Sequence, residues 1–151
     1  MKVYTSEGRE LLDTGDERSG HDLDSVDLSG LDLRHANLEG FNLSDANLRS
    51  VDLRNADLYW AILFRADLTD ADLRDTLLCG ADLKEATLTG ADLRGANLAK
   101  DNVGGPTQLQ GATLAKAKLG GAVLTGAEYD DATQFPRGFD PQANGMNKAP
   151  A

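Results

Sequence analysis

The side chains that could do chemistry are of few kinds in this 151-residue chain, and most are carboxylates. The chain has 25 acidic residues, two histidines, His21 and His35, and one cysteine, Cys79. Histidine and cysteine ligate zinc, but neither histidine has a cysteine or histidine neighbour at ligand spacing. Cys79 has no local base that would activate the thiol as a nucleophile. We therefore expect no metal site, no cofactor and no covalent catalysis.

The carboxylates recur about once every five residues, so a repeating structure would stack them close together. Two carboxylates about 5 Å apart are the catalytic pair of many glycosidases. Such a pair works inside a pocket, whereas these carboxylates are expected on a convex surface that faces solvent. The chain also has no Walker sequence and no GxGxxG loop for a nucleotide. These observations predict that the protein is not an enzyme.

The element that positions these side chains is a repeat of five residues. Residues 81–100 read ADLKE ATLTG ADLRG ANLAK, with a small residue first, Asp, Asn or Thr second, and Leu third. The third position is leucine at every fifth residue from Leu23 to Leu98 and again from Leu109 to Leu124. A period of five is typical of neither an amphipathic helix nor a plain strand. Self-similarity at a short, fixed period indicates a solenoid.

The motif A(D/N)LXX, repeated over residues 21–136, resembles that of the pentapeptide-repeat family. The resemblance implies an all-β solenoid, a right-handed quadrilateral β-helix in which four pentads form one 20-residue coil. Twenty-three pentads would then make about six coils. The first and third positions are expected to point inward, and the second, fourth and fifth to face water. Because one coil cannot bury its own leucines, stability must come from stacking against neighbouring coils.

The chain divides into three parts on this pattern. Residues 1–20 do not repeat, and Ser6 is expected to cap a short helix over residues 7–12 that covers the first coil; the alternative is a disordered tail. Residues 21–136 form the β-helix, with Val103 pointing inward and a one-residue insertion near residues 104–106. Residues 137–151 are expected to be a C-terminal cap and a mobile tail.

Charge and composition bound the partners of the protein. The net charge is −10, which argues against binding of nucleic-acid phosphates because that needs a basic face. No apolar run approaches the roughly 18 residues of a membrane span, and the N-terminal residues contain no apolar core of a signal peptide. A single cysteine is compatible with a reducing compartment. We therefore expect a cytoplasmic protein that binds neither membranes nor nucleic acid directly.

One group of apolar side chains departs from the polar outer pattern. The register forces Tyr59, Trp60, Ile62 and Phe64 outward, and one coil further on it places Leu77 and Cys79 outward as well. An exposed apolar patch with a charged rim usually marks a contact site, and Trp and Tyr are preferred anchors. We expect these six residues to bind a protein partner or a second copy of the chain. The alternative is that the aromatic rings lie flat on the rod.

A second feature of the surface is a stripe of paired charges. The sequence Asp-Leu-Arg recurs every 20 residues, which stacks Arg34, Arg54, Arg74 and Arg94 beside a column of aspartates. The stripe is either a structural device, in which opposite charges offset the repulsion along each column, or a docking site for an acidic partner. Exposed pairs of this kind contribute only about 0–1 kcal/mol each.

Two functions remain open on the sequence. The first is a non-catalytic interaction or scaffold module that binds a protein through one face. The second follows from the resemblance, because some pentapeptide-repeat proteins mimic DNA and bind DNA gyrase, and a net charge of −10 fits that role. Those relatives often have Phe in the third position and a dimerising C-terminal module, neither of which is evident here. The arginine column also interrupts a uniformly negative face.

Overall fold

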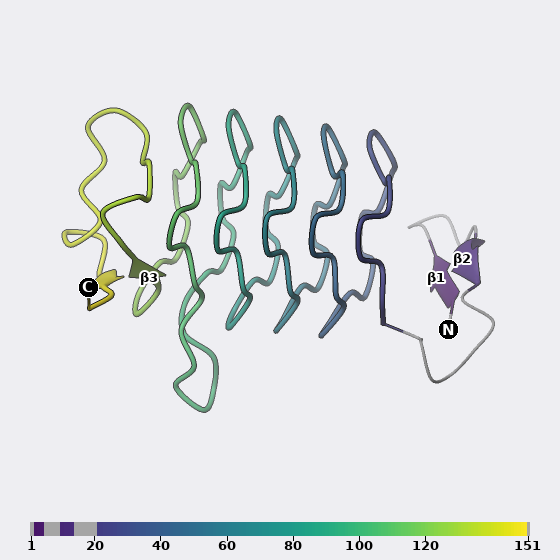
Figure 1. The fold of residues 1–151 in the computed structure, drawn as a ribbon, viewed down its shortest axis with the longest axis horizontal. Helices are drawn as coiled ribbons and strands as arrows, with labels where there is room; N and C mark the ends of the chain where they lie inside the picture. The colour runs from purple at the N-terminus through teal and green to yellow at the C-terminus, as the bar shows by residue number, and fades with distance from the viewer. Residues whose placement is uncertain (1, 5–9, 14–20, 151) are drawn as a thin grey trace.

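Stacked coils of nearly equal size form a rod along most of the chain (Figure 1). The computed structural model describes residues 2–4, 10–13 and 21–150. Four short strands lie at the two ends of the described chain: β1 (Lys2–Tyr4), β2 (Glu10–Asp13), β3 (Glu128–Tyr129) and β4 (Asn147–Lys148). β1 pairs with β2 antiparallel, and β3 pairs with β4 parallel. Between them the coils are joined by isolated parallel bridges.

Each coil has four sides, and the second residue of each pentad makes the bridge to the next coil. Side 1 runs through Asp22, Asn42, Ile62, Asp82, Gln108, Glu128 and Asn147. Side 2 runs through Asp27, Asn47, Asp67, Thr87, Thr113 and Gln134. Side 3 runs through Asp32, Asp52, Asp72, Asp92 and Lys118. Side 4 runs through Asn37, Asp57, Leu77, Asn97 and Val123.

The interior of the rod contains the first and third residues of the pentads, as predicted. The third-position leucines from Leu38 to Leu98 have no exposed surface, and the first-position alanines from Ala46 to Ala96 are at most 1% exposed. Thr76 occupies a first position and stays buried because its hydroxyl donates to the Leu73 carbonyl at 2.8 Å. A column of leucine beside a column of alanine fills the narrow square, in keeping with the close packing of protein interiors.

The corners explain the preferred residues at the second and fifth positions. The second-position carboxylate or amide oxygen accepts a hydrogen bond from the backbone N–H two residues later, as Asp57 does from Tyr59 at 3.0 Å. Asp and Asn favour this local turn. The fifth residue has a positive φ, 57° at Trp60 and 70° at Gly80, which satisfies the requirement of a type II turn. The outer positions are therefore chosen for turning the chain as well as for facing water.

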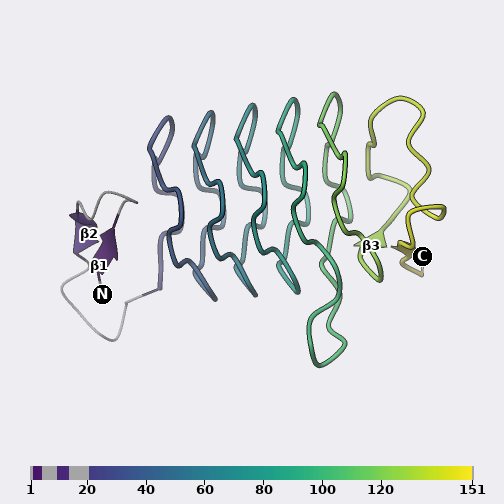
Figure 2. The ribbon, with the colours of Figure 1, turned by 180° about the vertical axis from the view of Figure 1, so that it is seen from behind.

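The interruption after Lys100 is larger than the sequence predicted. Bridges join residues 20 apart up to Leu77 and Asn97, whereas the four bridges that span the loop, from Asp82–Gln108 to Asn97–Val123, join residues 26 apart. The insertion therefore comprises six residues, 101–106, and the prediction of one residue was wrong. These residues form a loop, seen in green on the lower edge of the rod in Figure 2. Val103 is 80% exposed in this loop instead of pointing inward, because Thr107 takes the next buried first position.

The N-terminal prediction also needs correction. Residues Glu10 to Leu12 lie in strand β2, so the predicted helix over residues 7–12 is wrong there, and Ser6 lies outside the described residues. A six-residue helix is too short to be stable without tertiary support, whereas pairing with β1 satisfies the backbone groups of β2. His21, which the pattern placed inward, is exposed and packs against the Phe41 ring with centroids 4.9 Å apart.

The C-terminal residues cover part of the last coil, at the C-terminal end of the rod. Within the predicted C-terminal tail, Met146 is 4% exposed and β4 adds a last bridge to side 1, while most of the other residues from 142 to 150 are exposed. Phe135 and Phe139 stack with ring centroids 5.2 Å apart, and Phe135 also contacts Tyr129 at 5.5 Å. Phe135 and Phe139 pack against the core.

Candidate interaction surface

The corner between sides 4 and 1 is the most apolar outer part of the rod. Trp60 occupies the fifth position there, with Leu77 on side 4 and Ile62 on side 1. Their exposed fractions are 44%, 44% and 41%. The Tyr59 and Trp60 rings meet edge to face, with centroids 4.8 Å apart. These two aromatic residues do not lie free on the surface, because both bind the inserted loop.

The loop is fixed to the corner by side-chain hydrogen bonds. Trp60 Nε1 donates to Asp101 Oδ2 at 2.6 Å, and the Tyr59 hydroxyl donates to Asn102 Oδ1 at 3.0 Å while accepting from the Asn102 N–H at 2.9 Å. Asp101 Oδ1 accepts from the N–H groups of Val103 and Gly105 at 2.9 and 2.7 Å. The hydrogen bond from Trp60 is the main reason why the pKa of Asp101 lies below its usual value.

Thr107 joins the backbone segments of the coil by hydrogen bonds at the point where the inserted loop leaves it. Its hydroxyl contacts the carbonyl oxygens of Leu78 and Ala99 at 2.9 and 3.0 Å and accepts from the Gly80 N–H at 3.0 Å. Gly80 lies close beneath the indole, as shown by the 2.6 Å that would separate a Cβ at this position from Trp60 Cδ1. The loop therefore departs from an intact coil and presents Val103 next to the aromatic corner.

The six predicted contact residues are only partly brought together. Tyr59, Trp60, Ile62 and Leu77 surround the corner, but Cys79 is only 7% exposed, so its predicted outward position is wrong. Burial raises the pKa of the Cys79 thiol. Phe64 is half-buried on side 1, and the Arg65 guanidinium lies over its ring at 5.3 Å. Sequence reasoning missed Asp101, Asn102 and Val103 as part of this surface, although an aspartate in a first position, three residues before Gly104, was a signal.

The arginine column on side 3 is engaged within the protein. Arg54 Nε and Nη2 donate to the two oxygens of Asp52 at 2.9 and 2.7 Å. We call this bidentate pair a fork, and the same fork occurs at the other three arginines. Arg54 Nε also lies 3.5 Å from Asp72 of the next coil. The same bidentate pairs are Arg34–Asp32, Arg74–Asp72 and Arg94–Asp92.

These forks lower the pKa values of the aspartates. The hydrogen bonds from Arg34 lower the pKa of Asp32 to about 2. The pKa values of Asp52, Asp72 and Asp92 are lowered chiefly by the arginine two residues later in each case. The geometry favours the structural interpretation of the stripe, because each guanidinium already holds a carboxylate in its bidentate position.

Comparisons with known proteins match this repeat. The sequence model described as pentapeptide repeats matches residues 27–63 and 61–98. The crystal structure of the pentapeptide repeat protein Rfr23 from the cyanobacterium Cyanothece 51142 is 31% identical, with 77% of this chain and 88% of that chain covered and a TM-score of 0.69. The chain belongs to the pentapeptide-repeat family. Its fold is accordingly a right-handed β-helix solenoid.

Two further solved structures are similar to this pentapeptide-repeat chain. The pentapeptide repeat protein alr5209 from Nostoc Pcc 7120 is 40% identical, covering 75% of this chain and 84% of that one, with a TM-score of 0.43. The trypsin-treated R167E form of QnrB1, a plasmid-mediated fluoroquinolone resistance protein, is 19% identical, covering 86% and 88%, with a TM-score of 0.37. A search of curated protein sequences finds no match.

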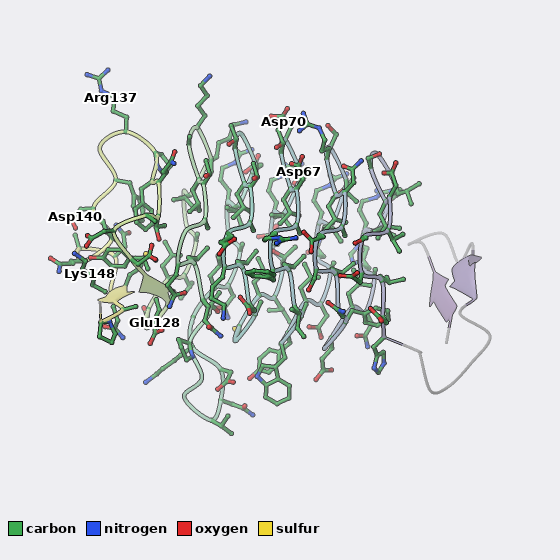
Figure 3. All side chains as sticks on the ribbon, in the orientation of Figure 1. Asp67, Asp70, Glu128, Arg137, Asp140 and Lys148 are labelled. Atoms are coloured by element: carbon green, nitrogen blue, oxygen red, sulfur yellow. The ribbon has the colours of Figure 1, made fainter. Side chains whose placement is uncertain are left out.

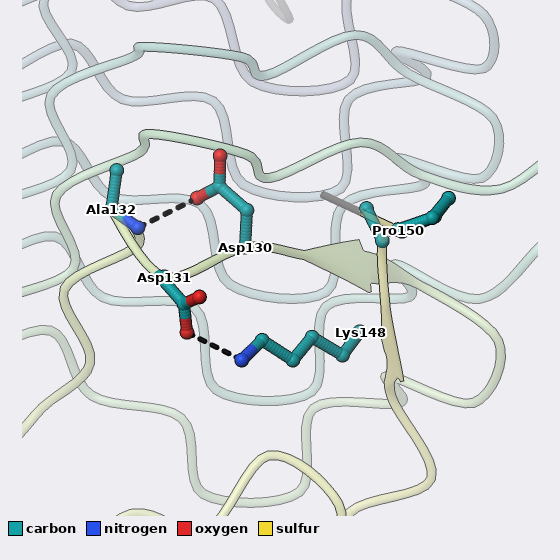
Figure 4. A pocket seen from close by; sticks show the side chains of 6 residues that line it. Asp130, Asp131, Ala132, Lys148 and Pro150 are labelled. Atoms are coloured by element: carbon teal, nitrogen blue, oxygen red, sulfur yellow. Dashed lines mark hydrogen bonds and ion pairs between the residues drawn. The ribbon is translucent and has the colours of Figure 1, made fainter.

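The charged groups on the wall of one hollow of this pentapeptide-repeat rod are paired within the protein. One hollow of about 660 Å³ lies beside β4, and Figure 4 shows Asp130, Asp131 and Lys148 on its wall. Asp130 is held by the backbone N–H groups of Gly111 and Ala132, and Lys148 pairs with Asp131 at 2.5 Å. Within residues 2–4, 10–13 and 21–150, no three His, Cys, Asp or Glu groups converge as metal ligands. That same part of the chain also contains no helix suited to crossing a membrane.

Proposed function

We propose that this chain is a non-catalytic interaction module that binds a protein partner through the corner made by Trp60, Ile62, Leu77 and the loop residue Val103. The observation that carries the proposal is the exposure of these four side chains, from 41% to 80%, at one place on a chain of net charge −10. Exposed apolar surface inside a charged rim is typical of a contact site. The hydrogen bonds that fix the loop mean that binding does not have to order it.

The test replaces apolar side chains that do not take part in those hydrogen bonds. The double variant Ile62→Ser/Leu77→Ser should lose partner recovery in affinity capture from the native source, while it keeps the melting curve of the wild type. Val123→Ser is the matched control, because Val123 is 46% exposed on side 4 but lies two bridges beyond Leu77. Equal partner recovery by all three proteins would exclude the corner as the binding surface.

A second copy of the chain is an alternative occupant of the same corner. Sedimentation of the wild type at increasing concentration measures this directly. A dimer that Ile62→Ser/Leu77→Ser dissociates and Val123→Ser preserves would identify self-association. A monomer at all concentrations would leave a different protein as the partner.

Mimicry of DNA toward gyrase is the second candidate function, favoured by the net charge of −10 on a rod. The forks on side 3 count against it, because they neutralise Asp32, Asp52, Asp72 and Asp92. A supercoiling assay decides the matter. Inhibition or protection of gyrase at micromolar protein would support mimicry, and no effect would exclude it.

A further inference from the structure

The columns of backbone bridges on the four sides of the rod do not all end at the same coil. Side 1 continues to Asn147 in β4, whereas side 3 ends at Lys118 and side 4 at Val123 within the described chain. Residues 135–141 leave the square there and form the yellow-green loop at the C-terminal end in Figure 1. The last complete strand edge on side 3 therefore lacks the neighbour that every earlier coil has.

The backbone groups of that edge can be assigned from the coil before it. There the Leu93 N–H donates to the Lys118 carbonyl at 2.8 Å, the Gly95 N–H donates to the Gly120 carbonyl at 3.1 Å, and the Ala91 carbonyl accepts from the Lys118 N–H at 2.9 Å.

One coil later the equivalent groups are the N–H groups of Leu119 and Gly121 and the carbonyl of Ala117. Among the described residues none of these three has a hydrogen-bond partner. Two donors and one acceptor thus remain open in the register that binds a parallel strand.

This edge forms one wall of a groove of about 450 Å³. Gly120 and Gly121 are exposed and have no side chains to shield the edge. Leu119 and Phe139 pack partly against the core and leave apolar surface in the groove. The groove is lined by Ala117, Leu119, Gly120, Gly121, Pro136, Arg137, Gly138, Phe139 and Asn144.

The charge around the groove is positive although the whole chain is acidic. Arg137 lines the groove, and Figure 3 shows it projecting from the tip of its loop. The exposed Lys116 and Lys118 flank the lining residue Ala117 along the chain. Lys118 lies 3.9 Å from Asp92, but that carboxylate already holds Arg94 at 2.6 Å. Asp140, on the loop after Phe139, accepts from the N–H groups of Gln142 and Ala143.

We propose that this groove binds an extended acidic segment of a partner protein, which adds to the open edge of side 3 as one more parallel strand. Strand addition takes its affinity from backbone hydrogen bonds and its specificity from alternate side chains. The site is separate from the Trp60 corner, so the proposal goes beyond the function proposed above.

The register of the rod defines the preferred sequence of the segment. Its second residue would bridge to Lys118, as Asp92 does, so an acidic side chain is favoured there. The N–H of that residue would donate to the Ala117 carbonyl, and its carbonyl would accept from the Leu119 N–H. The next residue would point inward over Leu119 and Phe139, which favours leucine. Two residues beyond the acidic one, a carbonyl would accept from the Gly121 N–H.

The probe is a fluorescein-labelled peptide Gly-Ala-Asp-Leu-Thr-Gly with an amidated C-terminus, titrated with the full chain and followed by fluorescence anisotropy. We expect saturable binding that weakens with salt. Methylation of the Asp nitrogen removes the donor to Ala117 and should weaken binding about ten-fold or more. Methylation of the Leu nitrogen is the matched control and should leave binding unchanged, because that N–H faces away from the edge.

Variants of the protein test whether the positive charges beside the groove contribute to the affinity for the peptide. Lys118→Glu and Arg137→Glu should each weaken the probe about five-fold, whereas Lys84→Glu, the same change on side 1, should not. Ile62→Ser/Leu77→Ser should bind the probe like the wild type, which keeps failure of this site distinguishable from failure of the corner.

Three outcomes would overturn the proposal. The first is no saturable binding, and the second is equal loss of affinity for both methylated peptides. The third is a concentration-dependent dimer that Lys118→Glu dissociates, because it would place a second copy on the edge instead. Melting curves equal to the wild type confirm that each variant is folded.

Discussion

Gly80 controls the position of the Trp60 indole, and a single methyl group tests this. Gly80→Ala places a Cβ 2.6 Å from Trp60 Cδ1 and 3.1 Å from Asp101 Oδ2, at a φ of 70°. Alanine at a positive φ costs about 1 kcal/mol, and losing the bond from Trp60 to Asp101 adds about 1 kcal/mol or more. We expect destabilisation of roughly 2–3 kcal/mol in urea unfolding, with tryptophan emission shifted to longer wavelength.

Gly30→Ala is the matched control for that substitution. Gly30 has a φ of 67°, and nothing lies within 4 Å of the added Cβ. It therefore isolates the backbone cost, about 1 kcal/mol, without any displacement of Trp60. Equal destabilisation by the two substitutions, with unchanged emission for both, would contradict the close packing of Gly80 under the indole.

Leu73 on side 3 and Leu77 on the neighbouring side 4 separate inward from outward positions in one coil. Leu73 has no exposed surface, and Leu77 is 44% exposed. Leu73→Ala should destabilise by about 2–5 kcal/mol, because the surrounding coils cannot collapse into the cavity. Leu77→Ala should stay within about 0.5 kcal/mol, as for a surface substitution. Both values come from urea unfolding, and similar losses for the two would contradict the assigned register.

The paired aspartates of side 3 make the free energy of unfolding depend on pH, so that it falls in acid. The folded-state pKa values of Asp32, Asp52 and Asp72 lie below the ordinary value, and that of Asp32 is about 2. A lowered pKa contributes stability above the unfolded-state value, near 4, and this is lost as pH falls toward 2. We expect the free energy of unfolding to decline most steeply between about pH 4 and pH 2.

Removing two forks should flatten that decline. Arg54→Gln/Arg74→Gln takes away the partners of Asp52 and Asp72, so less stability is left to lose in acid. Lys100→Gln/Lys116→Gln is the control, because no ion pair involves either lysine among the described residues. Urea unfolding at pH 7, 4 and 2 measures the difference. An acid decline of equal slope in both double variants would show that the forks do not carry it.

The coils, the inserted loop and the open edge also show how much of the fold the sequence alone could predict. Period and residue size sufficed for the ladders, because a square interior accepts only a small residue and a leucine from each pentad. They failed at Val103, which fits the pentad pattern by chance while the chain leaves the coil there. The open edge at Leu119 was likewise invisible, since it depends on where residues 135–141 leave the square. Contacts made between distant segments, such as Trp60 with Asp101, have no local signature.

At the scale of the whole molecule, the rod separates stability from recognition. Each coil is stabilised by its neighbours, so many outer positions can vary as long as the corners can turn. The two candidate surfaces lie where the repeat is interrupted: at the inserted loop, and at the C-terminal end where side 3 stops one strand early. At the first interruption the loop adds Val103 to apolar side chains that regular coils already expose, and at the second the missing strand leaves backbone hydrogen-bonding groups open.

Deletion of residues 101–106 tests the independence of coil and loop. Because bridges before the loop join residues 20 apart and the four that span it join residues 26 apart, removing six residues restores a spacing of 20 across the junction. Lys100 would then precede Thr107, which already occupies a buried first position. Shortening a surface loop changes stability by about 1 kcal/mol or less, so the melting curve should stay close to that of the wild type. Tryptophan emission should shift to longer wavelength, because Trp60 loses Asp101.

A deletion of the same length within the regular coils provides the contrast. Removing residues 61–66 takes out Ala61, Leu63 and Ala66, all without exposed surface. Because six is not a multiple of five, it also moves every later pentad by one position, so polar residues would face the interior and leucines would face water. We expect this variant to lose its cooperative thermal transition in circular dichroism while the loop deletion keeps it. If both deletions unfolded the protein alike, the loop would be part of the stacked core.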